Sequence, residues 1–238
     1  MCDLFGMSCN AEDRAWKSLA IFAHEHSENN PHGWGIGYYN NGKAIVKRAP
    51  EQAKTSQTFF SEIEKAKSNI IIAHVRARSV GMCCEENCHP FNGKLFNRDW
   101  IFAHNGTFKK FTQHPRSVGD TDSEQIFHTF LDQVESYQRN GVTHGTFSGI
   151  QQGIKTIFEK HGKNNGTLNF LMSDGTHLYA FHHNDDNDMY YLEREKDYGS
   201  ALLISTQKLG PGSWKRIRVD SLLMASNGKI DELSGPIF

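Results

Sequence analysis

The strongest constraint on the fold is the order of the predicted elements. Two consecutive amphipathic helices stand between two long stretches that favour β-strands. The apolar residues of these helices recur at helical spacing and are Ile126, Phe127, Phe130, Leu131, Val134, Ile150, Ile154, Ile157 and Phe158. This order is typical of two sheets with helices packed outside them, and it argues against a regular alternation of strand and helix.

The first half of the chain is predicted to hold strands at residues 3–9, 43–48, 69–75 and 99–104, and a glycine-rich turn that runs into a strand over 31–39. Helices are predicted at 11–25 and 56–68, and a long loop at 81–97. Residues 10–13 are predicted to cap the first helix. Asn41 and Gly42 favour a hairpin turn. Glycines at alternate positions, Gly35 and Gly37, indicate close approach of the backbone to another element or a ligand.

In the second half, Thr121 and Glu124 have the spacing of a capping box, which puts Asp122 in the first turn of a helix. Gly162 is predicted to end the second helix. Strands are then predicted at 167–173, 177–182, 189–194 and 201–205, with a final pair within 216–230. Residues 182–186 are interpreted as a solvated loop. Neither a repeat nor a linker divides the sequence, so we predict one domain over 1–238.

The composition narrows the class of protein. The chain has 238 residues and a net charge of −1, which gives no electrostatic reason to expect nucleic acid or an anionic membrane as a partner. Its sequence lacks the roughly 18 consecutive apolar residues of a membrane helix and the pattern of a signal peptide. We therefore expect a cytoplasmic protein.

The five cysteines, Cys2, Cys9, Cys83, Cys84 and Cys88, are odd in number and unevenly clustered, which argues against a secreted disulfide framework. Residues 83–89 contain three of them and a histidine, so zinc is an alternative interpretation. A second paired cluster is missing from the sequence, and neither His24-Glu25-His26 nor the other histidines have zinc-protease spacing. We expect a loop with incidental thiols, without a metal or a cofactor.

Cys2 lies directly behind the initiator methionine, and its small side chain permits removal of Met1. The residue would then carry a thiol and a free α-amine, with ordinary pKa values of about 8.5 and roughly 7.7–8.0. The amine can take the thiol proton, directly or through water, and create a nucleophile. The alternative is an ordinary buried residue on an N-terminal strand.

Four further polar positions fall, like Cys2, at the ends of predicted elements. Asn105 and Gly106 can donate hydrogen bonds to an oxyanion formed when a thiol attacks an acyl carbon. Arg76 can grip a carboxylate, and Asp122 can hold an ammonium group. Taken singly, each has a structural explanation, but together they favour a γ-acyl amino acid as substrate.

The sequence resembles the class II glutamine amidotransferases, which are N-terminal-nucleophile hydrolases, and it is most similar to the small stand-alone glutaminase-domain type. The resemblance implies an α+β fold, a four-layer αββα sandwich of two antiparallel sheets flanked by helices. The motifs that carry it span about half the chain. They are Met1-Cys2-Asp3-Leu4-Phe5-Gly6, His32-Gly33-Trp34-Gly35-Ile36, His74-Val75-Arg76-Ala77-Arg78-Ser79, Cys88-His89-Pro90-Phe91, His104-Asn105-Gly106 and Thr121-Asp122-Ser123-Glu124.

The resemblance also implies roles for individual residues. Cys2 is the nucleophile, with its own α-amine as base, and Asn105 and Gly106 form the oxyanion hole. Arg76 binds the α-carboxylate of glutamine and Asp122 its α-amino group. Three further residues, Ala77, Ser79 and His89, lie in the loop that closes over the substrate. Residues 24–30 depart from the His-Arg-Gly segment of some relatives, so an arginine contribution there is not expected.

The expected reaction is cleavage of a γ-glutamyl amide, giving glutamate and ammonia. The chain leaves no room for a synthase domain, so ammonia would pass to a synthase or acceptor subunit or be released. One alternative is a γ-glutamyl hydrolase that acts on a γ-glutamyl peptide or thiol conjugate. Another is a non-catalytic amino-acid-binding subunit. The sequence leaves a homo-oligomer open.

Overall fold

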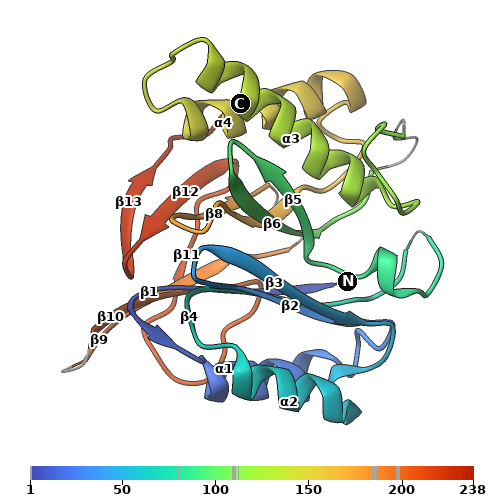
Figure 1. The fold of residues 1–238 in the computed structure, drawn as a ribbon, viewed down its shortest axis with the longest axis vertical. Helices are drawn as coiled ribbons and strands as arrows, with labels where there is room; N and C mark the ends of the chain where they lie inside the picture. Colours follow the sequence, from blue (N-terminus) through green and yellow to red (C-terminus); the bar gives the residue numbers. More distant parts are fainter. Residues whose placement is uncertain (1, 80, 109–110, 112, 184–186, 197–198) are drawn as a thin grey trace.

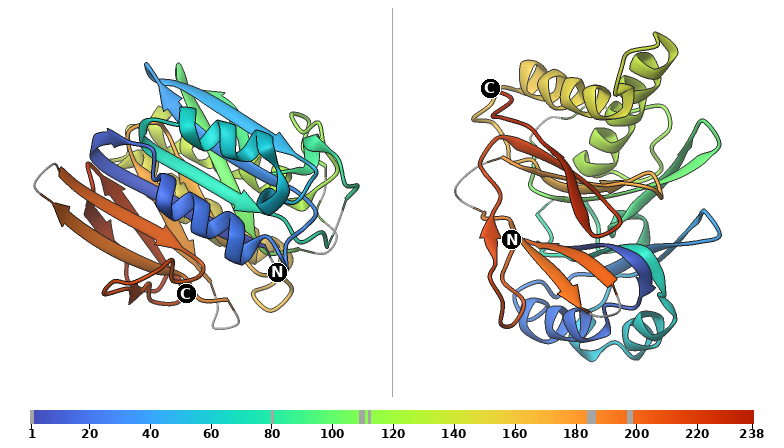
Figure 2. Two further views of the ribbon diagram at one scale, coloured as in Figure 1. Left: turned by 90° about the horizontal axis from the view of Figure 1, so that it is seen from below. Right: turned by 90° about the vertical axis from the view of Figure 1, so that its left-hand side faces the viewer.

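Two antiparallel β-sheets stack face to face between two layers of helices (Figure 1). This computed structural model describes residues 2–79, 81–108, 111, 113–183, 187–196 and 199–238. Met1, which we expect to be removed, and residues 184–186 of the predicted solvated loop lie outside these ranges. The arrangement confirms the predicted αββα sandwich, and Figure 2 shows the helices outside both sheets.

The first sheet has the strand order β11-β9-β10-β1-β4-β2-β3. Its members are β1 (Asp3–Asp13), β2 (Trp34–Asn40), β3 (Lys43–Ala49), β4 (Ser68–Val75), β9 (Tyr190–Lys196), β10 (Gly199–Ser205) and β11 (Lys215–Arg216). The N-terminal strand β1 lies between β4 and β10, with Asp3 opposite Val75 and Phe5 opposite Ser205. Strand β10, about 200 residues further along the chain, therefore lies beside the segment that contains Cys2.

The second sheet has the strand order β13-β12-β8-β7-β6-β5. Its members are β5 (Phe91–Leu95), β6 (Arg98–Asn105), β7 (Asn169–Ser173), β8 (Leu178–His182), β12 (Ser221–Ser226) and β13 (Lys229–Leu233). Asn105 is the last residue of β6 and pairs with Asn169 at the start of β7. The Cys2 thiol and the Asn105 amide thus lie at the ends of strands that belong to different sheets.

The helices α1 (Trp16–Ile21) and α2 (Gln57–Lys65) cover the first sheet, and α3 (Asp122–Arg139) and α4 (Gly145–His161) cover the second (Figure 1). Three short helical turns, η1 (Phe22–His26), η2 (Ala53–Thr55) and η3 (Glu85–Asn87), link these elements. Ser56 caps α2, since its side chain accepts a hydrogen bond from the Phe59 N–H. Gly162 follows the last residue of α4, as predicted.

Three apolar cores separate the four layers. Phe127 and Ile154 pack with β-strand residues between the second sheet and its helices. Leu19 and Phe59 belong to the core between the first sheet and its helices. The third core, which includes Ile72 and other residues of both sheets, lies between the sheets. Burial of apolar surface in these layers is the main driving force that stabilises the sandwich.

Some local predictions are confirmed in detail. Asn41 and Gly42 turn β2 into β3 with φ values of 50° and 75°, in the left-handed region that this dipeptide tolerates. Asn227 and Gly228 do the same between β12 and β13. The close approach predicted at Gly35 is also observed, because a Cβ atom there would lie 1.9 Å from the His89 carbonyl oxygen.

The prediction for residues 10–13 is wrong, because they extend β1 instead of capping a helix. Asn10 Oδ1 accepts a hydrogen bond of 2.8 Å from the Ser200 N–H, and Asp13 pairs with Ser68. Helix α1 begins only at Trp16, and η1 completes the segment. Pairing with strands distant in sequence overrides the local preference for a cap.

The predicted loop at 81–97 contains strand β5, which forms a hairpin with β6. The turn between them places Phe96 and Asn97 at positive φ values of 48° and 62°. Phenylalanine gives no signal for such a turn, so the sequence did not reveal the strand.

Two further predictions are corrected. The capping box does not form, because Glu124 accepts from the N–H groups of Val118 and Gly119 at 3.0 and 2.7 Å, although Asp122 does start α3. The described part of the predicted solvated loop, His182 and His183, is buried. His182 bonds through Nδ1 to the Ile217 carbonyl at 2.7 Å.

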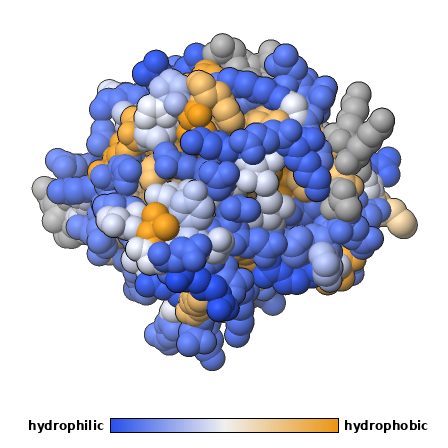
Figure 3. Space-filling model, turned by 90° about the horizontal axis from the view of Figure 1, so that it is seen from above, coloured by the Kyte–Doolittle hydropathy of each residue, from blue (hydrophilic) through white to orange (hydrophobic). Residues whose placement is uncertain are grey.

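The face over α3 and α4 is largely hydrophilic, with small scattered apolar areas (Figure 3). Among the described residues, no helix is both long and apolar enough to cross a membrane.

Candidate active site

Cys2 lies just before β1, beside the chain that leaves β4. Its Sγ atom is 3.3 Å from the Ala77 N–H nitrogen and 3.3 Å from the Ala77 carbonyl oxygen. The antiparallel register that sets Asp3 opposite Val75 brings these groups together. The thiol is therefore held by backbone that immediately follows Arg76.

Burial raises the pKa of the Cys2 thiol to about 11. The Ala77 N–H and the positive charge of Arg76 oppose this rise, because both favour the thiolate. The thiol is consequently protonated at neutral pH, and any attack by this sulfur needs a base.

Asn105 and Gly106 end β6 on the facing sheet. Asn105 is buried, and its Oδ1 atom has no hydrogen-bond partner in the described structure. A Cβ atom on Gly106 would lie 1.9 Å from the Thr167 carbonyl oxygen and 2.5 Å from His104 Nε2. Only glycine fits at this position, which keeps its backbone close to the β7 side of the sheet.

Cys2 and Asn105 line one cavity of about 810 Å³. The other lining residues are mostly polar and come from the start of β1, from η1 and the segment after it, and from the chain around β9 and β10. They are Asp3, Glu25, His26, Asn29, Asn30, Asn187, Asp188, Tyr190, Thr206, Gln207 and Lys208. The predicted nucleophile and oxyanion donor thus share a polar, open site.

Arg76 and Asp122 do not line this cavity. Arg76 is buried, and its Nη1 atom donates a 3.0 Å hydrogen bond to the Met82 carbonyl. Asp122 Oδ2 accepts a 2.5 Å hydrogen bond from the Phe108 N–H. In the described structure both side chains therefore hydrogen-bond to the backbone of the protein. The charge of Arg76 lowers the pKa of the Cys2 thiol.

The remaining predicted residues take different positions. Ala77 contacts the Cys2 thiol through its backbone N–H and carbonyl groups, and not through its side chain. Ser79 Oγ is 2.8 Å from Thr107 Oγ1, so it ties the chain after β4 to the chain after β6. These two contacts connect the candidate nucleophile and oxyanion segments.

His89 packs between the sheets and not in the cavity lining. Its ring centroid is 4.2 Å from that of His74, and its Nδ1 atom accepts a hydrogen bond of 3.2 Å from the His104 N–H. Burial and the neighbouring cationic groups hold the pKa of His89 well below its usual range. A neutral imidazole here supports the segment that precedes β5.

A polar network beside Cys2 was missed by the sequence analysis. The buried Asp3 carboxylate accepts from Thr206 Oγ1 at 2.7 Å and from Asn30 Nδ2 at 3.0 Å. His26 Nδ1 lies 3.4 Å from the same carboxylate. Thr206 and Asp3 are 203 positions apart, so no local pattern indicates this network.

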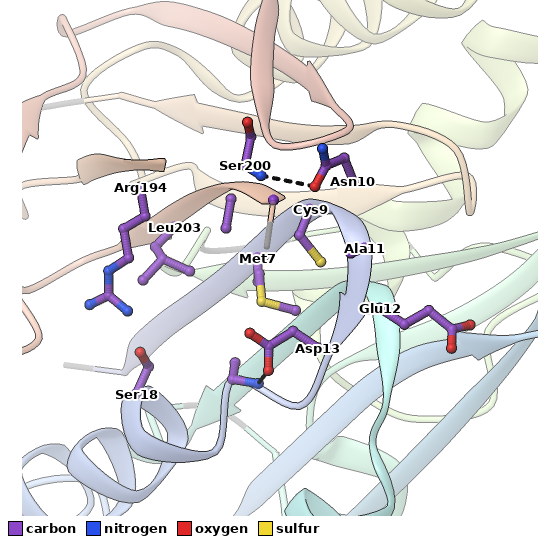
Figure 4. A pocket seen from close by; sticks show the side chains of 13 residues that line it. Met7, Cys9, Asn10, Ala11, Glu12, Asp13, Ser18, Arg194, Ser200 and Leu203 are labelled. Carbon is purple, nitrogen blue, oxygen red and sulfur yellow. Dashed lines mark hydrogen bonds between the residues drawn. The ribbon is translucent and has the colours of Figure 1, made fainter. Parts of the chain in front are cut away.

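A second pocket, of about 410 Å³, lies at the other end of β1 (Figure 4). Its walls include Met7, Cys9, Ser18, Arg194 and Leu203. None of the predicted site residues lines it. Of the predicted site residues, Cys2 and Asn105 line the larger cavity.

A family model described as "Glutamine amidotransferases class-II" matches residues 1–210. The chain belongs to this family. The class II assignment agrees with the αββα fold and with the resemblance that the sequence motifs indicated. A structure of a predicted glutamine amidotransferase from Pseudomonas aeruginosa has a similar fold, with a TM-score of 0.68, 20% identity, and coverage of 97% of this chain and all of that one.

Several curated proteins of related sequence extend the comparison. "Uncharacterized protein MJ1515" of Methanocaldococcus jannaschii is 31% identical over 98% of this chain, which spans 65% of that protein. "Putative glutamine amidotransferase YafJ" of Escherichia coli is 30% identical over 86% of this chain and 80% of its own length. A gamma-glutamyl-hercynylcysteine sulfoxide hydrolase of Mycobacterium tuberculosis is 30% identical over 38% of this chain and 37% of its own.

Proposed function

We propose that this class II protein cleaves the γ-amide of glutamine, or of another γ-glutamyl compound, through a thioester on Cys2. The observation that carries the proposal is the shared cavity of the Cys2 thiol and the Asn105 amide, which come from opposite sheets. Thiols are nucleophiles in covalent acyl transfer. An amide donor and a backbone N–H at Gly106 can stabilise the developing oxyanion.

The proposed proton path starts at the thiol, because burial raises its pKa to about 11 and keeps it protonated at neutral pH. After removal of Met1, the α-amine of Cys2 takes the thiol proton as sulfur bonds to the γ-carbon. The same proton passes to the leaving nitrogen as the carbon–nitrogen bond breaks. Water then attacks the thioester, giving glutamate and restoring the thiol.

In this proposal Arg76 binds the α-carboxylate of the substrate and Asp122 its α-amino group. Arg76 lies close enough to lower the pKa of Cys2 by its charge, and bidentate pairing suits arginine and carboxylate. Its bond to the Met82 carbonyl would yield to the substrate. Ala77 and Ser79 would hold the closing loop against Cys2 and Thr107, while His89 would support that loop from the core.

A γ-glutamyl hydrolase with a larger leaving group is the second candidate, and the volume of the Cys2 cavity favours it. We further propose that residues 1–238 act as one catalytic domain. Ammonia would be released or passed to a synthase or acceptor subunit. A non-catalytic amino-acid-binding subunit is the remaining alternative.

The experiment begins with intact mass, which reports whether Met1 is removed. Glutamate release from glutamine is then measured for the wild-type protein and for Cys2→Ser, and an electrophilic glutamine analogue is used to label the protein. We expect processed chains, Cys2-dependent turnover and labelling at Cys2. Retained Met1 in an active protein, or equal turnover of Cys2→Ser, would exclude the proposed mechanism.

A further inference from the structure

The cavity around Cys2 is much larger than ammonia requires. Its volume of about 810 Å³ falls within the range of roughly 300–1,000 Å³ that is typical of small-molecule sites. A molecule the size of water, which is similar to ammonia, occupies only about 30 Å³. The space beside the nucleophile is therefore suited to a leaving group of several heavy atoms.

The position of this space identifies which half of a substrate it would receive. This step rests on the proposed function, in which Arg76 and Asp122 hold the amino-acid end of the γ-glutamyl group. Neither residue lines the cavity, whereas Cys2 and Asn105 do. Since the attacked carbon lies between the two halves of the substrate, the cavity lies on the side of the leaving nitrogen.

Two of the four carboxylate and ammonium groups in the cavity wall, Asp3 and Asp188, have partners. The Asp188 carboxylate contacts Arg216 Nε at 2.6 Å and accepts a hydrogen bond from the Tyr190 hydroxyl, and these contacts lower its pKa. Asp3 is buried in its hydrogen-bond network with Thr206. These two carboxylates are therefore satisfied by the protein itself.

Lys208 and Glu25 differ from those groups, because neither has an ion-pair partner among the residues that the structure describes. The Lys208 ammonium lies 4.9 Å from the centroid of the Tyr190 ring, which holds this cation at the cavity wall. Glu25 is on η1, at the opposite end of the sequence, and the side chains of both Lys208 and Glu25 are exposed. A ligand with a carboxylate can pair with Lys208 without displacing a protein contact to another charge.

The wall also carries side-chain amides from Asn29, Asn30, Asn187 and Gln207. Amide groups can donate and accept hydrogen bonds, so they suit the peptide and carboxylate groups of an amino acid. With the Lys208 cation, which has no ion-pair partner among the described residues, and this amide lining, the cavity matches a polar leaving group with a carboxylate better than an apolar one.

We propose that this cavity is a leaving-group subsite for γ-glutamyl amino acids or γ-glutamyl peptides, in which Lys208 pairs with the free carboxylate of the departing half. The Cys2 sulfur forms a bond to the γ-carbon, and the bond from that carbon to the amino acid nitrogen breaks. The nitrogen takes the thiol proton, so the departing half leaves as a free amino acid or peptide. Lys208 determines specificity and takes no part in bond making.

Two γ-glutamyl amides of similar size test the subsite. In γ-glutamylglycine the leaving half ends in a carboxylate, and in γ-glutamylethylamide a methyl group takes its place. We would measure kcat/KM for both compounds with the processed wild-type protein, Lys208→Met and Glu25→Gln. The ratio of the two values is internal to each variant, so a smaller folded fraction does not change it.

We expect the wild-type protein to favour γ-glutamylglycine by about two- to fivefold, the contribution of an exposed ion pair, and Lys208→Met to bring the ratio close to one. Glu25→Gln is the matched control from the same cavity and should keep the preference. A wild-type ratio near one, or a preference that survives Lys208→Met, would overturn the subsite. So would faster cleavage of γ-glutamylethylenediamine that depends on Glu25, because the subsite would then select a cation.

Glutamine itself separates this inference from the function on which it rests. Cys2-dependent hydrolysis of glutamine without any preference for γ-glutamylglycine would refute the subsite and leave the proposed function intact. Failure to cleave glutamine and both γ-glutamyl amides after Met1 removal would refute the proposed function, and the subsite with it.

Discussion

Replacing Gly106 with alanine offers the sharpest test of the proposed oxyanion hole. The added Cβ would lie 1.9 Å from the Thr167 carbonyl oxygen, and the obstacle is backbone and not a flexible side chain. The two chains must separate by about 1 Å or more, and a displacement of that size can cost about 100-fold in rate. Loss of one oxyanion donor costs roughly 100- to 1,000-fold in kcat.

We therefore expect Gly106→Ala to lower kcat for glutamine by about 100- to 1,000-fold. Glutamate release measures this loss, and alkylation of Cys2 by iodoacetamide serves as a second readout because it requires no oxyanion hole. The alkylation rate should stay close to that of the wild-type protein. Gly235→Ala is the matched control, since a Cβ there meets nothing within 4 Å. A folded Gly106→Ala protein with kcat within about fivefold of wild type would refute the assignment.

Three other predictions concern Arg76, the hydrogen-bond network of Asp3 and the buried His74. Arg76→Ala should raise KM for glutamine by about tenfold or more in steady-state kinetics, because a charge-assisted pair with the substrate carboxylate is lost; an unchanged KM would contradict its role. Asp3→Asn should lower the free energy of unfolding by about 2–3 kcal/mol in urea titrations, since the buried carboxylate accepts from Thr206 and Asn30; Thr206→Ser, which keeps the hydroxyl donor, should lose much less. Burial lowers the pKa of His74 to about 3, so below pH 6.5 the unfolded chain binds a proton that the folded chain does not. Stability should consequently fall as the pH falls, by about 2–3 kcal/mol from this group between pH 7 and 4.5, and a His74→Phe variant with an equally steep loss would disprove that origin.

The layer order of the fold could be predicted because it depends on patterns that are local in sequence. Helical spacing identified α3 and α4, and Asn-Gly pairs identified two hairpins. The boundaries that failed depend on partners far along the chain. Asn10 bonds to Ser200, 190 positions away, and this contact keeps residues 10–13 in β1.

The candidate site was predictable to a similar extent. Cys2 and Asn105 could be proposed from their chemistry and from motifs, and the structure brings both to one cavity. The Asp3 network and the place of Lys208 in the cavity wall could not, since they become visible only when β10 lies beside β1. Sequence motifs therefore predicted the candidate reactive groups. The residues of the cavity wall come together only when strands distant in sequence pair.

The bond between Asp3 and Thr206 has a consequence for the order in which the protein is built. The candidate nucleophile leaves the ribosome about 200 residues before Thr206, which belongs to the same cavity wall. Contacts so distant in sequence form slowly, because a long loop must close first. A nascent or truncated chain that lacks β10 would carry the Cys2 thiol without this cavity wall, so activity should appear only after β10 and the residues that follow it have been synthesised.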